Sequence, residues 1–450
     1  MGFKSALLRL VPRLRQFFTG QSGNVAITFA LAAIPLLGAV GAAIDYSRAN
    51  DAKVKLQQAL DATALMLSKE AASVPSSQLQ TDASSYFLAQ FDPPGVQNIA
   101  INATYSSTGG SSIVLDASAA VQTTFMKIFG YNLINLRSTS TVRWGSTRLR
   151  VAMVLDNTGS MQQAGKMSAL KTAAKSFLSQ MQAAATSNGN VYVSIIPFST
   201  SVNVGSVNYT QSWLTWTDYG TCNGGGGHSS NSYTQALCKA AGGNWVAYSS
   251  SKQSNWTGCI TDRGATNGPT GSNYDTNVSM PAIGNSATLY PAVQYSSCPQ
   301  EAMGLSYNWS AMNTLIDNMS PNGMTNQNIG LQTGWMSLVG GGPFTAPATD
   351  PAYTYKYIVV LFTDGLNTED RWYTSQSSID SRQTMTCSNM KAAGLTIYTV
   401  QISTDGTASS PLLQNCASDT NKYFYLTSSS QLVTTFNQIG TDITRLYVAK

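Results

Sequence analysis

The sequence is poor in charge and almost free of histidine. Only 10% of its 450 residues are charged, against roughly 25% in an average soluble domain, and its one histidine, His228, lies in a glycine-rich stretch. A histidine-based catalytic triad therefore has no plausible base, and no Gly-x-x-x-x-Gly-Lys phosphate loop occurs. These absences predict a binding protein rather than an enzyme, and the low charge is typical of extracytoplasmic proteins.

The net charge of +5 comes almost entirely from the N-terminus. Lys4, Arg9, Arg13 and Arg15 precede the first acidic residue, so the rest of the chain carries 22 bases against 21 acids. A basic surface for nucleic acid is therefore not expected.

A spanning segment follows this basic cluster. Residues 24–44 contain no charge, and in a helix they extend about 30 Å, the thickness of a hydrocarbon core. The bases before the run and Asp45 after it predict a cytoplasmic segment at 1–23, a transmembrane helix at 24–44 and a periplasmic remainder, in a single-pass protein of the bacterial inner membrane. A cleaved secretory signal is the alternative, although this run is long for one.

Residues 45–146 are expected to form a stalk helix and a small α+β module. Apolar residues recur on one side of the helical pattern at Ala49, Ala52, Leu56, Ala59, Leu60 and Leu67. This face either joins copies of the chain through the stalk or packs into the following module. Strands are predicted at 98–107, 112–118 and 133–143, with a helical stretch near Val121 to Phe129.

Residues 147–450 alternate strands with helices. Strands are predicted at 150–155, 191–197, 356–363, 395–401 and 422–426, and the clearest helix runs from about Gln162 to Ala184. This alternation predicts an α/β domain with a doubly wound, largely parallel, Rossmann-like sheet covered by helices on both sides. Such sheets bind ligands beyond the carboxyl ends of their strands.

Five oxygen-bearing side chains are predicted to meet at those strand ends. Asp156, Thr158 and Ser160 follow the first strand at alternate positions, Thr325 lies in a turn-like loop, and Asp364 ends a later strand. Aspartate and hydroxyl oxygens suit a hard cation such as Mg²⁺ or Mn²⁺. The sequence therefore predicts an oxygen-only metal site.

At these positions the chain resembles the von Willebrand factor A (VWA) family. The metal-ion-dependent adhesion site (MIDAS) of that family has a DxSxS run, a distant threonine and a distant aspartate, and the one departure here is Thr158 in place of serine. The resemblance implies a metal with an open coordination position that attracts an acidic residue of a partner protein.

The order of the N-terminal parts resembles TadG-like tight-adherence (Flp) pilus assembly proteins. The resemblance is carried by a TadE/TadG-like start at 23–31, by 38–48 and 56–65, and by shorter stretches at 196–199, 256–259, 415–418 and 422–424. It departs at Thr28, where pilin-like members carry glutamate, which argues against prepilin-peptidase cleavage.

Together these resemblances imply a membrane-anchored, periplasm-facing pilus assembly factor that binds other components of the pilus or secretion machinery through its metal site. The alternative is a surface-exposed, metal-dependent adhesin that contacts host or abiotic material. Retention of the 24–44 anchor favours the assembly factor.

An insertion at 204–305 interrupts the VWA-like domain and holds four of the six cysteines. Cys387 and Cys416 are predicted to pair, and Cys222, Cys238, Cys259 and Cys298 to pair among themselves in one of three ways. Zinc is a weaker alternative because no Cys-x-x-Cys pair occurs. The aromatic residues of the insertion either build a small core or form an exposed binding surface, and the insertion itself is hypothesised to frame the metal.

Overall fold

The computed structural model describes residues 23–71, 73–107, 110–144, 147–224, 234–264 and 272–448. The basic segment before residue 23 and the glycine-rich stretch with His228 lie outside the described residues. The chain divides into two compact units, one ending at Trp144 and the other beginning at Gly145, and each is considered by itself.

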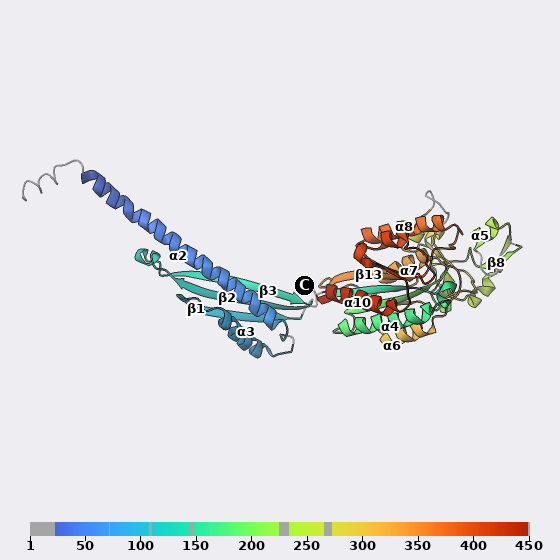
Figure 1. Ribbon diagram of the computed structural model, residues 1–450, viewed down its shortest axis with the longest axis horizontal. Coiled ribbons are helices and arrows are strands. Elements are labelled where there is room, and N and C mark those ends of the chain that lie inside the picture. The colour runs from blue at the N-terminus through green and yellow to red at the C-terminus, as the bar shows by residue number, and fades with distance from the viewer. Residues whose placement is uncertain are drawn as a thin grey trace, which may run out of the picture. The chain divides into compact units, whose positions relative to one another are not determined.

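The first unit packs two helices against a three-stranded antiparallel sheet of order β1-β2-β3 (Figure 1). Its elements are α2 (Gly23–Leu67), α3 (Ser76–Gln90), β1 (Val96–Ser106), β2 (Ser111–Gln122), the 3₁₀ turn η1 (Met126–Phe129) and β3 (Leu133–Trp144). The three predicted strands are thus present. The stretch predicted as helical near Val121 to Phe129 is helical only in η1, because its first residues extend β2.

Helix α2 has two halves with different surroundings. From residue 27 to 44 it is mostly exposed, and it is long and apolar enough to cross a membrane. Further along, the predicted apolar face is buried against α3 and the sheet, with Leu56 and Leu60 fully inaccessible. The face predicted for the stalk therefore serves as the core of the module.

The second unit is built on an eight-stranded, largely parallel sheet. Its path is β10-β6-β5-β4-β13-β14-β15, and β12 pairs with β5. The strands are β4 (Thr147–Asp156), β5 (Val191–Phe198), β6 (Val202–Asn203), β10 (Cys259–Ile260), β12 (Met303–Ser306), β13 (Thr354–Thr363), β14 (Thr396–Ile402) and β15 (Tyr423–Leu426). The five strands from β5 to β15 run parallel, as the alternation of elements predicts.

Helices cover both faces of this sheet, which explains why β4 is apolar on both sides. Val151, Met153 and Leu155 pack toward one layer, whereas Ala152 and Val154 pack toward the other. The first layer contains α4 (Lys166–Ala184), α6 (Trp309–Asn318) and α10 (Gln431–Val448), and the second contains α7 (Gln327–Val339), α8 (Gln376–Ala392) and α9 (Pro411–Cys416). Buried parallel sheets require such double cover.

Helix α4 begins later than the sequence pattern predicts. The prediction places its start near Gln162, but a short 3₁₀ turn, η2 (Gly159–Gln162), comes first and α4 starts at Lys166. The break lies at Ala164 and Gly165, whose φ angles are 50° and 67°. A left-handed pair cannot continue a right-handed helix.

The parallel strands follow the chain order 2-1-3-4-5, so the connections change direction between β4 and β13. The two strands lie side by side and run parallel. In sheets of this kind, ligands bind at this switch point, beyond the carboxyl ends of the two strands. Asp156 ends β4, and Asp364 directly follows β13.

The insertion forms short strands and turns whose buried aromatics pack against one face of the sheet. Its further elements are η3 (Ser206–Thr210), β7 (Leu214–Thr215), β8 (Gly220–Asn223), α5 (Gln235–Ala240), β9 (Asn244–Ala247), η4 (Ser250–Asn255), η5 (Tyr274–Thr276), η6 (Ser286–Thr288) and β11 (Tyr290–Pro291). Trp256 and Tyr219 are each 2% exposed, and Trp216 contacts both rings. Tyr219 and Trp256 are thus core residues, and they pack into the same hydrophobic cluster as the sheet rather than into a separate core.

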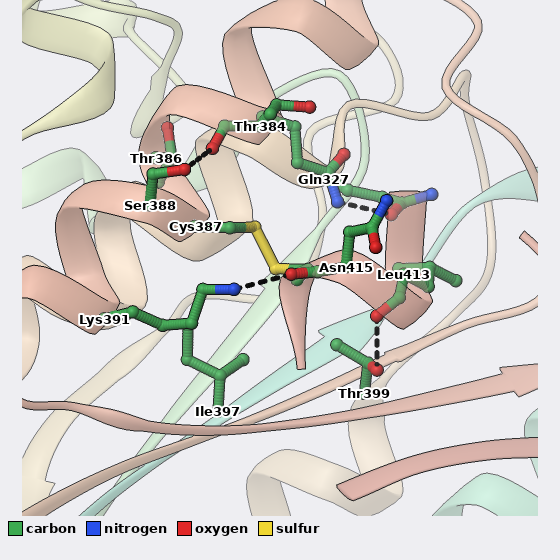
Figure 2. Close-up of a disulfide and its surroundings, with 12 residues drawn as sticks. Gln327, Thr384, Thr386, Cys387, Ser388, Lys391, Ile397, Thr399, Leu413 and Asn415 are labelled. Atoms are coloured by element: carbon green, nitrogen blue, oxygen red, sulfur yellow. Dashed lines mark hydrogen bonds between the residues drawn. A yellow bond between two sulfur atoms is a disulfide. The ribbon is translucent and has the colours of Figure 1, made fainter. Parts of the chain in front are cut away.

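Three disulfides join the six cysteines. They link Cys222 to Cys238, Cys259 to Cys298 and Cys387 to Cys416, which confirms the predicted pair and selects one of the three open connectivities. Figure 2 shows the last bond joining α8 to α9, beside a hydrogen bond of 2.6 Å from Lys391 Nζ to the Asn415 carbonyl. The disulfide therefore holds the α8–α9 layer together next to β14.

Candidate metal centre

Asp156 is the most enclosed of the five predicted ligands. It is fully buried at the end of β4. Its Oδ1 accepts hydrogen bonds from the Thr158 amide at 2.8 Å and from Thr158 Oγ1 at 2.6 Å, and its Oδ2 accepts one from Thr363 Oγ1 at 2.7 Å. The carboxylate is thus oriented by both strands of the switch point.

Ser160 connects this group to Asp364. The Ser160 hydroxyl donates to Asp364 Oδ1 at 2.7 Å and lies 3.1 Å from Thr158 Oγ1. Residues 204 positions apart in the chain therefore meet. This contact follows from the parallel pairing of β4 and β13, which brings their carboxyl ends to one edge.

The loop that carries Thr325 is attached to the Asp156–Ser160 loop through the backbone. The Asn322 amide donates to the Asn157 carbonyl at 2.8 Å, and the Gly159 amide donates to the Gly323 carbonyl at 3.0 Å. Gly323 has a φ of 88°, and a Cβ there would lie 2.7 Å from Ser297 Cβ, so a side chain would not fit. Close approach of these two loops therefore depends on this glycine.

Thr325 also contacts the loop after Asp364. Its amide donates to Thr368 Oγ1 at 2.8 Å, and its carbonyl accepts from the Thr368 amide at 2.9 Å. Among the described residues its hydroxyl makes no hydrogen bond to the other four predicted ligands. The structure therefore joins Asp156, Thr158, Ser160 and Asp364 directly, and brings in Thr325 through its loop.

A further residue, Lys166, was not anticipated from the sequence. Its ammonium group forms an ion pair with Asp364 Oδ2; the Lys166 side chain is 6% exposed and that of Asp364 is fully buried. Lys166 is the first residue of α4, where the helix dipole disfavours a positive charge. The Asp364 carboxylate offsets this unfavourable interaction. A lysine near a helix start is normally solvated, but this one directly follows the left-handed residues Ala164 and Gly165 and is buried against Asp364.

Burial dominates the electrostatics of the centre. Loss of hydration, and then the negative charge of Asp364, raise the pKa of Asp156 to about 6, while the hydrogen bonds from Thr158 and Thr363 oppose this rise. Two carboxylates thus lie close together with one ammonium group as compensation. A cation that contacted both carboxylates would relieve this repulsion.

The donor set fits a hard divalent ion. It consists of two carboxylates and three hydroxyls, the oxygen ligands that Mg²⁺ and Mn²⁺ prefer. Within the part of the chain that the structure describes, no group of three or more histidine, cysteine or acidic side chains could hold a metal. A metal here would therefore depend on hydroxyl ligands, and Ser160, the one exposed member of the five, marks the side from which it is reached.

The strand order, the two helical layers and the strand-end aspartates define a doubly wound α/β domain that resembles the von Willebrand factor A type. Residues 23–68 match the family model described as "Putative Flp pilus-assembly TadE/G-like". The chain thus combines a TadE/G-like N-terminal segment with a VWA-like domain. A comparison with curated proteins found no match.

Several solved structures are similar at low identity. The vWF domain of the type V pili tip protein Mfa5 from Porphyromonas gingivalis is 10% identical, with a TM-score of 0.38, over 68% of this chain and 97% of that one. The pilus adhesin SpaC from Lactobacillus rhamnosus GG is 15% identical, with a TM-score of 0.36, over 79% of this chain and 36% of that one, so the match spans about a third of its length. Mussel byssus proximal thread matrix protein 1, with a zinc-occupied MIDAS motif, is 12% identical, with a TM-score of 0.33, over 67% and 47%.

Proposed function

We propose that this protein is a membrane-anchored pilus assembly factor of the tight-adherence (Flp) system, facing the periplasm, that binds partner proteins through a site dependent on Mg²⁺ or Mn²⁺. The TadE/G-like match at 23–68 supports the pilus role. The observation that carries the binding role is the meeting of Asp156, Thr158, Ser160 and Asp364 at the switch point of the sheet.

In this proposal Asp156 and Asp364 supply the negative charge, and Thr158, Ser160 and Thr325 supply neutral oxygens. Because only two of these groups are charged, a bound divalent ion would keep a positive field and offer an open position to a carboxylate of the partner. Thr363 and the Thr158 amide hold Asp156 in place. Gln327 holds the other loop, since its side chain donates to the Gly365 carbonyl at 3.0 Å.

Lys166 has a defined part in this proposal. Its ammonium group pairs with the Asp364 oxygen that Ser160 leaves free, so it competes with any divalent ion for that carboxylate. Metal binding requires Lys166 to turn away from Asp364. The lysine therefore lowers the affinity for metal, while it keeps the buried carboxylate compensated when no metal is bound.

The surface around the centre suits a protein ligand. Met324 and Leu366 are 43% and 39% exposed, and they lie on the two loops that carry Thr325 and Asp364. Exposed apolar side chains beside a charged anchor are typical of binding surfaces. The insertion lies against the same loops, because Asn326 donates to Asp262 Oδ2 at 2.7 Å and the Arg371 amide donates to the same oxygen at 3.3 Å. These contacts support the hypothesis that it helps to choose the partner.

Binding, rather than catalysis, is the proposed activity, because a hydrolytic metal site usually adds histidines or further carboxylates. A surface adhesin is distinguished from an assembly factor by cell fractionation. The assembly factor is expected in the inner membrane with α2 retained, and a released form without this helix would contradict it.

The substitution Asp156→Ala tests the site. It is expected to abolish the increase in melting temperature caused by millimolar Mg²⁺ or Mn²⁺, and to abolish chelator-sensitive capture of partners from envelope extracts, because it removes a direct ligand. The matched control is Asp317→Ala, at an exposed carboxylate paired with Lys175. An Asp156→Ala protein that binds metal and partners as the wild type does would overturn the proposal.

A further inference from the structure

Four residues on one side of α2 hold the connection between β2 and β3. They are Gly38, Gly41, Asp45 and Arg48, and their spacing of three and four positions places them along one helix face. Asp45 Oδ1 accepts from the Thr124 amide at 2.9 Å, and its Oδ2 accepts from the Phe125 and Met126 amides at 2.8 Å each. One turn further on, Arg48 donates to Thr124 Oγ1 at 2.8 Å.

The two glycines allow aromatic rings to touch the helix backbone. A Cβ on Gly41 would lie 2.5 Å from Phe125 Cβ, and one on Gly38 would lie 2.9 Å from Phe129 Cζ. The connection therefore extends along α2 from Asp45 back to Gly38, a distance of about 10 Å at 1.5 Å per residue. Both glycines belong to the uncharged run, so this contact lies within the stretch expected to enter the membrane.

The connection also exposes large apolar side chains, although two of its rings touch α2. Ile128 is 79% exposed, Phe129 55%, Phe125 41% and Tyr131 64%. Leu37 and Val40 on the neighbouring part of α2 are 68% and 51% exposed. These side chains extend the apolar surface of the helix, at the end of the sheet where the apolar half of α2 emerges (Figure 1).

The uncharged run alone does not determine where the membrane begins. Residues 16 to 44 carry no charge, whereas about 20 residues suffice to span a bilayer. A span that ends near Leu37 would leave the η1 connection in water with four large apolar side chains exposed. A span that ends near Asp45 places them in the outer part of the bilayer, with Lys127 and Tyr131 able to reach its interface.

We propose that the β2–β3 connection, from Phe125 to Tyr131, is a second membrane-inserted element that dips into the periplasmic leaflet beside α2. Its ligand is the lipid bilayer itself. Asp45 then lies at the membrane boundary, with its charge satisfied by three backbone amides. The fastening along α2 fixes the module at a set depth, so that it does not rotate freely on a single helix. The inference rests on the proposed anchor and is independent of the metal centre.

The test uses the full-length protein in liposomes. All six native cysteines are in disulfides, so Ile128→Cys introduces the single free thiol, which is labelled with a bimane fluorophore. Lipids carrying a nitroxide at the 5-position of the acyl chain are expected to quench this label at least threefold. The matched controls are Leu36→Cys on α2, expected to be quenched, and Ala89→Cys on the exposed side of α3, expected to be unaffected.

The controls separate the possible outcomes. Quenching at 128 and 36 but not at 89 supports insertion of the tip. Quenching at position 36 alone overturns this inference and leaves the proposed anchor in place. If position 128 is protected from a water-soluble maleimide but is not quenched by the lipids, the inference is also overturned, in favour of a protein contact. No quenching at either position overturns both the tip and the anchor, while the metal response of the second unit stands as an independent measurement.

Discussion

Two groups of buried carboxylates in the second unit are compensated in different ways. At the switch point, Asp156 and Asp364 are surrounded by hydroxyls and one lysine. Where the insertion meets the rest of the unit, its Asp275 forms a two-pronged ion pair with Arg382, and its Asp218 forms an ion pair with Arg371, at 2.8 Å. Guanidinium groups compensate the second group permanently, whereas hydroxyls leave the first group suited to an exchangeable cation.

Burial raises the pKa of an acid in each region, at Asp156 near the switch point and at Asp370 and Glu369 near the insertion. Near the insertion, desolvation raises the pKa of Asp370 to about 8 and that of Glu369 to about 7, and Asp262 adds a smaller repulsion to Asp370. The insertion group therefore combines arginine-paired carboxylates with acids that hold protons near neutrality. In the proposed function the first group binds the metal, whereas the ion pairs of the second group hold the insertion in place.

The largest effect is expected from Arg382→Met. This change removes the partner of Asp275, which is 1% exposed, and an unpaired buried charge costs about 4 kcal/mol. Urea unfolding is expected to show this loss, while the metal-induced shift persists in the protein that remains folded. Arg445→Met, at an exposed residue of α10, is the control. Equal stabilities of the two variants would remove the structural role assigned to the arginine pair.

Lys166→Met is expected to have opposite effects with and without metal. In the absence of metal it leaves Asp364 uncompensated and lowers the free energy of unfolding by about 3 kcal/mol. In titration calorimetry it raises the affinity for Mg²⁺ about tenfold or more, because the competing ammonium group is gone. The matched control is Lys171→Met, whose exposed ammonium group donates to the Asp317 backbone carbonyl at 2.9 Å. Weaker metal binding by Lys166→Met would contradict competition.

Stability is expected to rise as the pH falls from about 8 toward 5. The folded state holds protons on Asp370 and Glu369 that the unfolded chain has released, since their folded pKa values of about 8 and about 7 exceed the ordinary values of 3.8 and 4.5. Together the two groups correspond to a gain on the order of 6 kcal/mol between pH 8 and pH 5. Thermal unfolding in chelator across this range measures it, and Asp370→Asn is expected to flatten the dependence. An unchanged slope in this variant would assign the effect to other groups.

The smallest effect is expected from Thr158→Ser, which keeps the hydroxyl that contacts Asp156 and Ser160. Metal affinity should change by less than about threefold, equivalent to about 0.6 kcal/mol. Thr158→Val, similar in size but without the hydroxyl, should weaken metal binding clearly more. If serine and valine behave alike, the Thr158 hydroxyl is not a ligand.

Much of the fold and part of the centre were predictable because their signals are local. Apolar runs of strand length followed by Asp156 and Asp364, separated by helical patterns, predict parallel strands whose carboxyl ends meet at one edge. The uncharged run predicts the anchor from its length alone. The Cys387–Cys416 pair was also anticipated.

Other features required the tertiary structure, because they depend on contacts between distant segments. Lys166 looks like a surface lysine until the turn at Ala164 and Gly165 directs it to Asp364. The apolar side chains of the β2–β3 connection could equally belong to a core by sequence. Only the structure shows that Asp45 binds the backbone of this connection beside α2, where the side chains stay exposed. The sequence by itself determined which segments form strands and helices and which helix is long and apolar enough to cross a membrane, because periodicity and length act locally. Only the tertiary structure decided which charges compensate one another and which apolar surface stays uncovered, because burial is a property of the assembled chain.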